Sequence, residues 1–166
     1  MFPPLSLFPG VPLPLLGMHR EELLELDEVC SELARLGCLR FSHLARLYRA
    51  FGQRLAGALE ALRERRVKKY VFKPSGRVIW VVVGREREYL VMPRAPFCSC
   101  DDFYFRVIDG EAKLCYHLIA QRLAECLNWF EAVEEEDENY EAVLEELRGL
   151  GGAGGPAVGR EQGGVL

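Results

Sequence analysis

Hydrophobic residues in the first half of the chain recur every three or four positions, the spacing of an amphipathic helix. A first helix is predicted from His19 to Gly37, where the glycine supplies a C-terminal stop. A second is predicted to begin near Ser42, a residue type that caps helix N-termini, and to continue to Leu62. The apolar stripe of this second helix comprises Leu44, Leu47, Tyr48, Phe51, Leu55, Leu59 and Leu62.

The period changes after Arg66, where residues 67–73, 77–84 and 88–92 predict three strands joined by tight turns. We expect a small three-stranded antiparallel sheet. The middle segment is apolar on both faces from Val78 to Val83, which favours a central strand with a helix on one side and another layer on the other.

Helical spacing returns from Leu114 to Phe130. A last amphipathic helix is predicted within 132–150, from about Glu135, since acids at its start suit the helix dipole. Its stripe comprises Tyr140, Val143, Leu144, Leu147 and Leu150. The fold class is therefore α+β, with N-terminal helices, a small antiparallel sheet and further helices.

The two ends of the sequence differ from its middle. Residues 1–17 hold five prolines and no Lys or Arg, which argues against a signal peptide and favours a Pro-rich apolar arm or an over-extended translation start. Residues 151–166 are predicted to be a disordered Gly-rich tail. Between them we expect a helical region over 18–66 and a second domain over 67–131.

Composition narrows the class of protein. The 166 residues are 49% apolar and 28% charged, with a net charge of −4, which is typical of a soluble globular protein. The longest apolar run, Val78 to Val83, is far below the roughly 18 residues that a membrane-spanning helix needs, so no membrane partner is expected. Six cysteines and three histidines are too few for a disulfide miniprotein but enough for one metal site.

Two close pairs of metal-ligand residues, Cys98 with Cys100 and Cys115 with His117, form the pattern C-x-C, a 14-residue gap, then C-x-H. Three thiolates and one imidazole complete a tetrahedral shell for one structural Zn²⁺. Side chains two apart on a flat strand diverge by about 6 to 7 Å, so a turn must bring the first pair together. A helix beginning at the second pair would stabilise the Cys115 thiolate and orient His117. The intervening residues are apolar enough to pack.

Other readings of the cysteines and histidines stay open. The four residues could be buried free thiols with an incidental histidine. Cys126 falls on an apolar helical stripe and is interpreted as a core residue. A second metal site at Cys30, Cys38 and His43 would lack paired spacing, and a disulfide has no secretion signal to support it. We expect His19 and His43 at the surface or in helix caps.

The runs FCSCDDF and LCYHLIA resemble a SWIM-type zinc finger, and the fuller pattern C-x-C, C-x-H-x-x-A is similar to the Sws-type SWIM proteins of Shu recombination complexes. Ala120 supplies the final alanine, one helical turn after His117, where a methyl group would let the cysteine turn approach closely. The resemblance covers roughly residues 45–125 and assigns 67–131 as a SWIM domain. It includes Phe51, Gly52, Pro74, Ser75, Gly76, Arg77, Gly84 and Tyr89.

A basic segment precedes the finger, with a single acid between residues 63 and 77. Its cations could follow a nucleic-acid backbone, with Tyr70 and Phe72 stacking on bases. The alternative is a solvated helix end and an edge strand whose lysines deter edge pairing. Asp101 and Asp102 make the finger itself a poor phosphate contact. The candidate nucleic-acid residues are Arg63, Arg65, Arg66, Lys68, Lys69, Lys73 and Arg77.

By contrast, residues 131–146 carry nine acids and no base, a pattern more typical of a solvated face than of a docking element. The opposite apolar stripe must be buried on this domain or on a partner.

An enzyme is not expected, since the ligand set leaves no open position on zinc and no Walker loop, G-x-S-x-G, H-E-x-x-H or H-x-E deaminase motif is present. A redox switch at Cys98 and Cys100 is a weaker alternative. No small-molecule substrate is predicted.

The resemblance implies a cytoplasmic, non-catalytic adaptor that assists homologous recombination and DNA repair through a RecA-family paralogue, with single-stranded DNA as a further partner. The alternative is a stand-alone DNA-binding zinc module that uses the basic segment 63–77, and a pure protein scaffold is third. Zinc should supply folding free energy, so the metal-free chain should be loose or unfolded.

Overall fold

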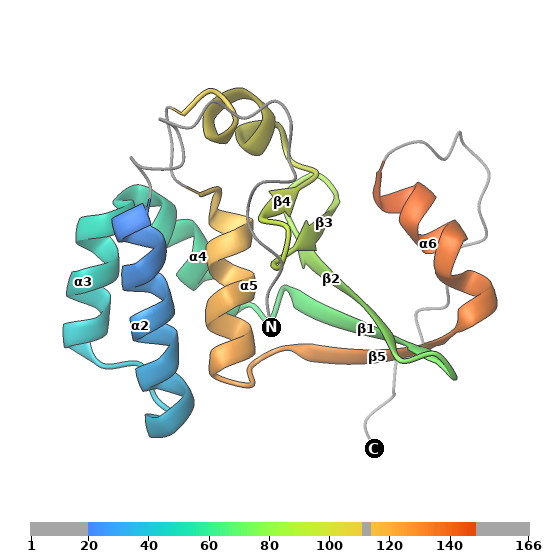
Figure 1. Ribbon diagram of the computed structural model, residues 1–166, viewed down its shortest axis with the longest axis horizontal. Helices are drawn as coiled ribbons and strands as arrows, with labels where there is room; N and C mark the ends of the chain where they lie inside the picture. The colour runs from blue at the N-terminus through green and yellow to red at the C-terminus, as the bar shows by residue number, and fades with distance from the viewer. Residues whose placement is uncertain (1–19, 111–113, 149–166) are drawn as a thin grey trace, which may run out of the picture.

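The computed structural model describes residues 20–110 and 114–148. A layer of helices covers one face of a five-stranded sheet, and a single helix, α6 (Tyr140–Leu147), covers the other (Figure 1). The α+β class is confirmed. The predicted arm over 1–17 and the predicted tail over 151–166 lie outside the described residues.

The N-terminal region forms three helices where two were predicted: α2 (Arg20–Leu36), α3 (Phe41–Phe51) and α4 (Gln53–Arg63). The single helix expected from Ser42 to Leu62 is wrong, because Gly52 adopts a φ of 55° and turns the chain between α3 and α4. The Gly52 N–H still donates to the carbonyl of Tyr48 at 2.8 Å, a C-terminal cap for α3.

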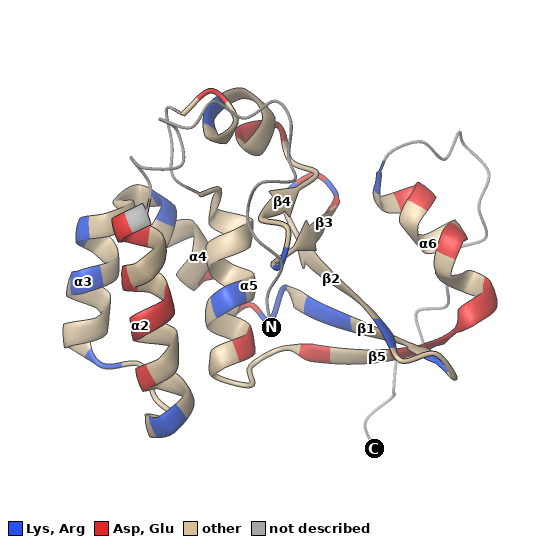
Figure 2. Cartoon of the chain, in the orientation of Figure 1, with Lys and Arg blue, Asp and Glu red and all other residues tan. Residues whose placement is uncertain are grey.

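Polar contacts join α2 to α3. Arg46 of α3 pairs with three glutamates on successive turns of α2, at 2.5 Å (Glu25), 3.1 Å (Glu28) and 2.7 Å (Glu32). Figure 2 shows acidic residues along α2 and basic residues on α3 beside it. His43 caps α3, as one of the two expectations had it, because its Nδ1 accepts from the Arg40 N–H at 3.2 Å. It is nevertheless buried, with Nε2 3.0 Å from Glu32, so a surface position for it is wrong.

The three predicted strands are present as β1 (Val67–Lys73), β2 (Arg77–Val83) and β3 (Glu88–Met92), paired antiparallel. The sheet is larger than the three strands expected. β4 (Phe97–Cys98) adds to β3, and β5 (Glu131–Glu136) pairs parallel to β1, giving the order β4-β3-β2-β1-β5. β2 is the central strand, as its apolar sequence predicts.

The acidic segment is only partly helical, so the helix predicted within 132–150, from about Glu135, is wrong for the residues before Tyr140. Glu131–Glu136 is strand β5, Asp137–Asn139 a short 3₁₀ turn, and helix α6 begins at Tyr140. The carboxylates can lie along a strand because β1 beside them is basic (Figure 2). Lys73 of β1 pairs with Glu134 of β5 at 2.8 Å. The boundary predicted after residue 131 therefore falls inside the sheet.

Each face of the sheet has its own core. The larger core packs α2, α3, α4 and α5 (Tyr116–Cys126) on the face that carries Trp80 and Val82. The smaller core packs α6 on the face that carries Ile79 and Val81. The apolar stripe of the acidic segment is therefore buried on this domain, through Leu144 and Leu147.

Candidate metal centre

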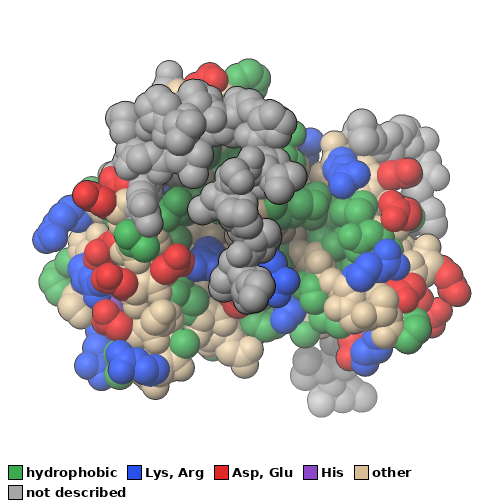
Figure 3. Space-filling model, viewed as in Figure 1, with side chains coloured by type: hydrophobic (Ala, Val, Ile, Leu, Met, Phe, Trp, Pro, Cys, Tyr) green, Lys and Arg blue, Asp and Glu red, His purple; other side chains and the backbone are tan. Residues whose placement is uncertain are grey.

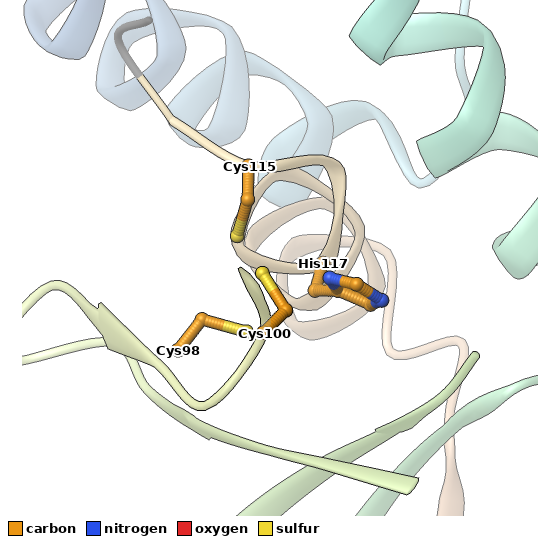
Figure 4. Close-up of side chains that lie close together, drawn as sticks. All are labelled: Cys98, Cys100, Cys115 and His117. Carbon is orange, nitrogen blue, oxygen red and sulfur yellow. The ribbon is translucent and has the colours of Figure 1, made fainter. Parts of the chain in front are cut away.

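The four predicted metal ligands come from two elements that meet at the end of the sheet (Figure 4). Cys98 is the last residue of β4 and Cys100 follows in the turn that leaves the strand. Cys115 is the N-cap of α5 and His117 lies in the first turn of that helix. The expected turn and helix start are both present.

Their donor atoms all lie within 4.8 Å of one another, and all four side chains are buried. Ligand atoms of a tetrahedral zinc site are roughly 4 Å apart, so the four residues match a zinc shell in number, type and spacing. Both ring nitrogens of His117 are buried without a hydrogen-bond partner among the described residues. A bound cation would satisfy one of them, which is a second sign that the cluster fits a metal.

The thiols of Cys98 and Cys115 both interact with that of Cys100. Hydrogen bonds from Cys115 and Cys98 hold the pKa of the Cys100 thiol far below its ordinary value, and the Phe103 N–H donates to its Sγ at 3.3 Å. Hydrogen bonding to Cys100 raises the pKa of Cys115 to about 12 and also raises the pKa of Cys98. Three thiolates held this close together repel one another, so they need a divalent cation to stabilise them.

Two aromatic rings enclose His117. Its ring centroid lies 3.8 Å from Tyr116 and 4.4 Å from Tyr89. The position of Tyr89 depends on Gly84, because a Cβ at residue 84 would lie 2.3 Å from the Tyr89 ring. Gly84 and Tyr89 belong to the pattern that carries the family resemblance. Gly84 leaves room for the Tyr89 ring, and that ring in turn packs beside His117.

Tight packing also surrounds the helical pair of ligands. Ala120 is fully buried in the same core cluster as Cys98, Cys100 and Cys115. Gly57 of α4 lies against Tyr116, where a Cβ would approach the ring to 3.2 Å. A larger residue at either position would push α5 away from its neighbours.

The segment between the ligand pairs is only partly packed, which corrects the expectation that it would bury its apolar residues. It forms a π-helical turn, η1 (Phe103–Val107). Phe103 is buried with its ring 5.5 Å from that of Phe97. Phe105, in contrast, is 71% exposed and Ile108 is 54% exposed.

The predicted nucleic-acid residues are not gathered on one free surface. Arg63 and Arg66 line a cleft of about 1010 Å³ beside His117, together with acids from α4, the β2–β3 turn and the finger. Arg66 is only 16% exposed and pairs with Glu64 at 3.0 Å. Arg65 lies over the ring of Trp129, with its guanidinium carbon 4.0 Å from the centroid.

The cations of β1 and its hairpin turn are likewise engaged. Lys68 pairs with Glu88 at 3.0 Å and Arg77 with Asp137 at 3.5 Å. Lys69 lies 5.3 Å from the ring of Trp80. β1 runs between β2 and β5, so the alternative of an exposed edge strand is wrong.

The remaining cysteines do not assemble a second site. The Cys98, Cys100, Cys115 and His117 group is the one cluster of potential ligands in the described part of the chain. Both ring nitrogens of His43 are already engaged, Cys38 is exposed, and Cys126 packs against the larger core.

These features define a zinc finger whose ligands close the coordination shell. The chain is 29% identical over 131 residues to the zinc finger SWIM domain-containing protein 7 homolog of Dictyostelium discoideum, covering 78% of this chain and 84% of the relative. It is 30% identical over 108 residues to zinc finger SWIM domain-containing protein 7 of Mus musculus, covering 63% of this chain and 70% of the relative. No family model and no solved structure matches the chain.

The chain belongs to the SWIM-type zinc finger proteins and is a zinc-binding SWIM protein. None of the helices in the described residues is long and apolar enough to cross a membrane.

Proposed function

We propose that one Zn²⁺ per chain, held by Cys98, Cys100, Cys115 and His117, fixes the fold rather than performing chemistry. Four protein ligands leave no position for a substrate or water on a tetrahedral ion. Each ligand is buried, so the centre is enclosed by protein. The ion supplies the charge that permits three thiolates to lie together and ties the start of α5 to the end of the sheet.

We further propose that the protein is a non-catalytic adaptor that assists homologous recombination by binding a RecA-family paralogue. The observation that carries the proposal is the buried, closed ligand set in a chain of the SWIM family. The resemblance of its C-x-C, C-x-H-x-x-A pattern to the Sws-type proteins of Shu complexes supplies the choice of partner. The chain would then contact single-stranded DNA only as part of its complex with the RecA-family protein.

A stand-alone DNA-binding role is less well supported by the structure. Such a role needs cations that are free to neutralise phosphates. Among the candidate cations of residues 63–77, five pair with carboxylates of the same chain: Arg63, Arg66, Lys68, Lys73 and Arg77.

We place the adaptor in a reducing compartment, the cytoplasm. The six cysteines all lie in the described residues, and none of them forms a disulfide. Thiolate ligands need protection from oxidation, and free thiols persist where glutathione and thioredoxin keep them reduced.

Co-purification from extracts of the protein's own cells tests the adaptor proposal. The tagged full chain should recover a RecA-family protein in a stoichiometric amount that survives 0.5 M salt, roughly the strength at which surface charge contacts are screened. The purified chain alone should bind a single-stranded oligonucleotide weakly. Tight, salt-sensitive DNA binding by the chain alone, with no RecA-family protein recovered, would contradict the proposal and favour the DNA-binding alternative.

A further inference from the structure

The central strand β2 has an open edge over its first three residues. β3 pairs with β2 only from Trp80 to Val83, and the chain then turns away through residues 93–96. Residues 77–79 have β1 on one side and no paired strand on the other within the described part of the chain. Val78 is 43% exposed although it lies on the central strand of the sheet.

Backbone polar groups face this open edge. The Val83 N–H donates to the Arg66 carbonyl at 2.8 Å on the β1 side, and the Gly84 N–H donates to the Arg87 carbonyl at 2.9 Å on the β3 side. Neighbouring residues of an antiparallel strand turn their N–H and C=O groups to alternate sides. Val78 lies six positions before Gly84, an even offset, so its N–H and C=O point to the side where β3 has ended.

Positive charge surrounds the edge. A notch of about 700 Å³ lies there, with Trp80 and Tyr140 among its walls and Glu125 as its one carboxylate in the described residues. Hydrophobic and basic side chains lie together between the helical layer and α6 on the face shown in Figure 3. The cations of the notch are Lys69, Arg77, Arg94 and Arg122.

Among the described residues, two of these cations have carboxylate partners and two do not. Arg77 pairs with Asp137 and Arg122 with Asp27. Lys69 and Arg94 have no carboxylate partner among the described residues, and Arg94 is exposed at the turn that ends β3. The notch therefore combines an open strand edge with a surplus of positive charge.

We propose that this notch docks an extended acidic segment of a partner protein, which adds to β2 as an antiparallel strand in line with β3. The partner backbone would pair with the N–H and C=O of Val78. Its side chains would alternate between the two faces of the sheet, toward Arg77 on the α6 face and Arg122 on the other. The inference rests on the proposed adaptor role and names the surface that such an adaptor would use.

A peptide suits this edge better than a nucleic acid does. The positive charge of the notch does not distinguish an acidic peptide from a nucleic acid, because carboxylates and phosphates are both negative. A phosphodiester backbone, however, offers only acceptors, whereas a peptide backbone supplies both a donor and an acceptor for the paired groups of one strand residue.

A binding experiment with the zinc-loaded full chain tests the docking site. The probe is a fluorescent eight-residue peptide of alternating glutamate and valine, and the matched probe replaces each glutamate by lysine. The acidic peptide should bind and the basic one should not. Arg94→Glu should raise the dissociation constant at least about tenfold, as rim charge reversals do when complementarity matters. Arg85→Glu reverses an arginine that is 83% exposed at the far end of the β2–β3 hairpin, and it should leave binding unchanged.

A second variant tests the strand pairing itself. Val78→Pro removes an N–H that faces the open edge while the ladder to β1 uses the residues on either side. It should abolish peptide binding with circular dichroism and zinc content intact, whereas Val78→Thr should bind as the wild type does. Hydrogen exchange of the Val78 amide should slow at least about tenfold when the peptide is bound.

Other results would reject the docking site, the choice of a peptide as its ligand, or the adaptor proposal. Failure of the acidic peptide to bind, or equal binding by wild type and Arg94→Glu, would overturn the docking site. A further outcome is that a thymidine oligonucleotide displaces the peptide from the wild type. If this displacement is lost in Arg94→Glu but kept in Val78→Pro, the notch binds nucleic acid through charge and not a peptide through strand pairing. If the peptide fails while the RecA-family protein still co-purifies, only the notch is rejected. If the peptide binds and that protein is absent, only the adaptor proposal is rejected.

Discussion

The two faces of the sheet are stabilised in different ways. The face toward α2–α5 carries the larger core and, at its end, the buried metal ligands. The face toward α6 carries a small core and no metal-ligand cluster in the described residues. The buried residues of that small core are Phe72, Ile79, Val81, Leu90, Leu144 and Leu147.

This difference indicates a division: zinc would support the helical face in addition to its hydrophobic core, whereas the α6 face depends on hydrophobic packing alone. Removing a metal ligand should unfold the helical layer, because the ligands are themselves part of its core. Weakening the α6 face should release α6 and leave the zinc centre in place. Mutations on each face can therefore test whether the division is real.

The largest effect is expected for Cys115→Ser. This change removes a thiolate that ties the start of α5 to the sheet. The zinc should be lost together with folding free energy on the order of the domain's whole stability, about 5 to 15 kcal/mol. Circular dichroism and zinc analysis are the measurements, and Cys38→Ser, at an exposed cysteine, is the matched control. A folded Cys115→Ser protein would show that the larger core does not need the metal.

A smaller and local effect is expected for Leu147→Ala on α6. Leu147 is 6% exposed, so its truncation should lower the free energy that holds α6 on the sheet by about 2 to 5 kcal/mol. Amide exchange should accelerate in α6, while zinc content and the protection of α5 stay unchanged. Leu24→Ala, at a residue 51% exposed, should change neither helix. Loss of zinc from Leu147→Ala would mean that the two faces fold as one unit.

Gly84→Ala tests the aromatic support of the metal ligand. The added Cβ would lie 2.3 Å from Tyr89, so the ring must move away from His117. We expect a loss of about 1 to 3 kcal/mol from overpacking. Zinc affinity should fall by roughly 10- to 100-fold, as for other residues that orient a metal ligand. Competition with a chromogenic chelator measures the zinc affinity. An unchanged affinity would show that Tyr89 does not support His117.

The smallest effect concerns Asp137 in the turn before α6. Hydrogen bonds from the Ser75 hydroxyl (2.5 Å) and N–H (3.0 Å), with Arg77 nearby, hold the pKa of Asp137 below its ordinary value. A depressed folded-state pKa contributes stability above the unfolded value of about 3.9, and this contribution is lost as pH falls through the folded pKa. Ser75→Ala should raise the pKa of Asp137 measured by NMR titration. An unchanged pKa would show that these contacts are not made in solution.

Much of the fold could be predicted because local patterns and tertiary contacts agree. The bounds of β1 and β3, and nearly those of β2, follow from their alternation and turns, and the apolar sequence of β2 identified the central strand. The four ligands could be found from spacing and residue chemistry alone. In both cases the residues that form the feature lie close together in the sequence.

The remainder depends on contacts between distant segments. Glu131–Glu136 has the composition of a solvated helix, and only the neighbouring β1, some 60 residues earlier, makes it a strand. The charges of residues 63–77 look free in the sequence because partners such as Glu88 and Asp137 come later in the chain. The sequence alone does not show that Tyr89 supports His117, because only the folded β2–β3 hairpin brings the two rings together. A glycine at residue 84 was the one sign that another group packs closely against the chain at this turn.

The zinc content of the purified wild-type chain tests the central claim most directly. Elemental analysis of metal per chain, on protein shown to be folded by circular dichroism, should give one zinc, and stripping it with a chelator should remove the helical signal of the larger core. A well-folded chain that contains no zinc would contradict the account.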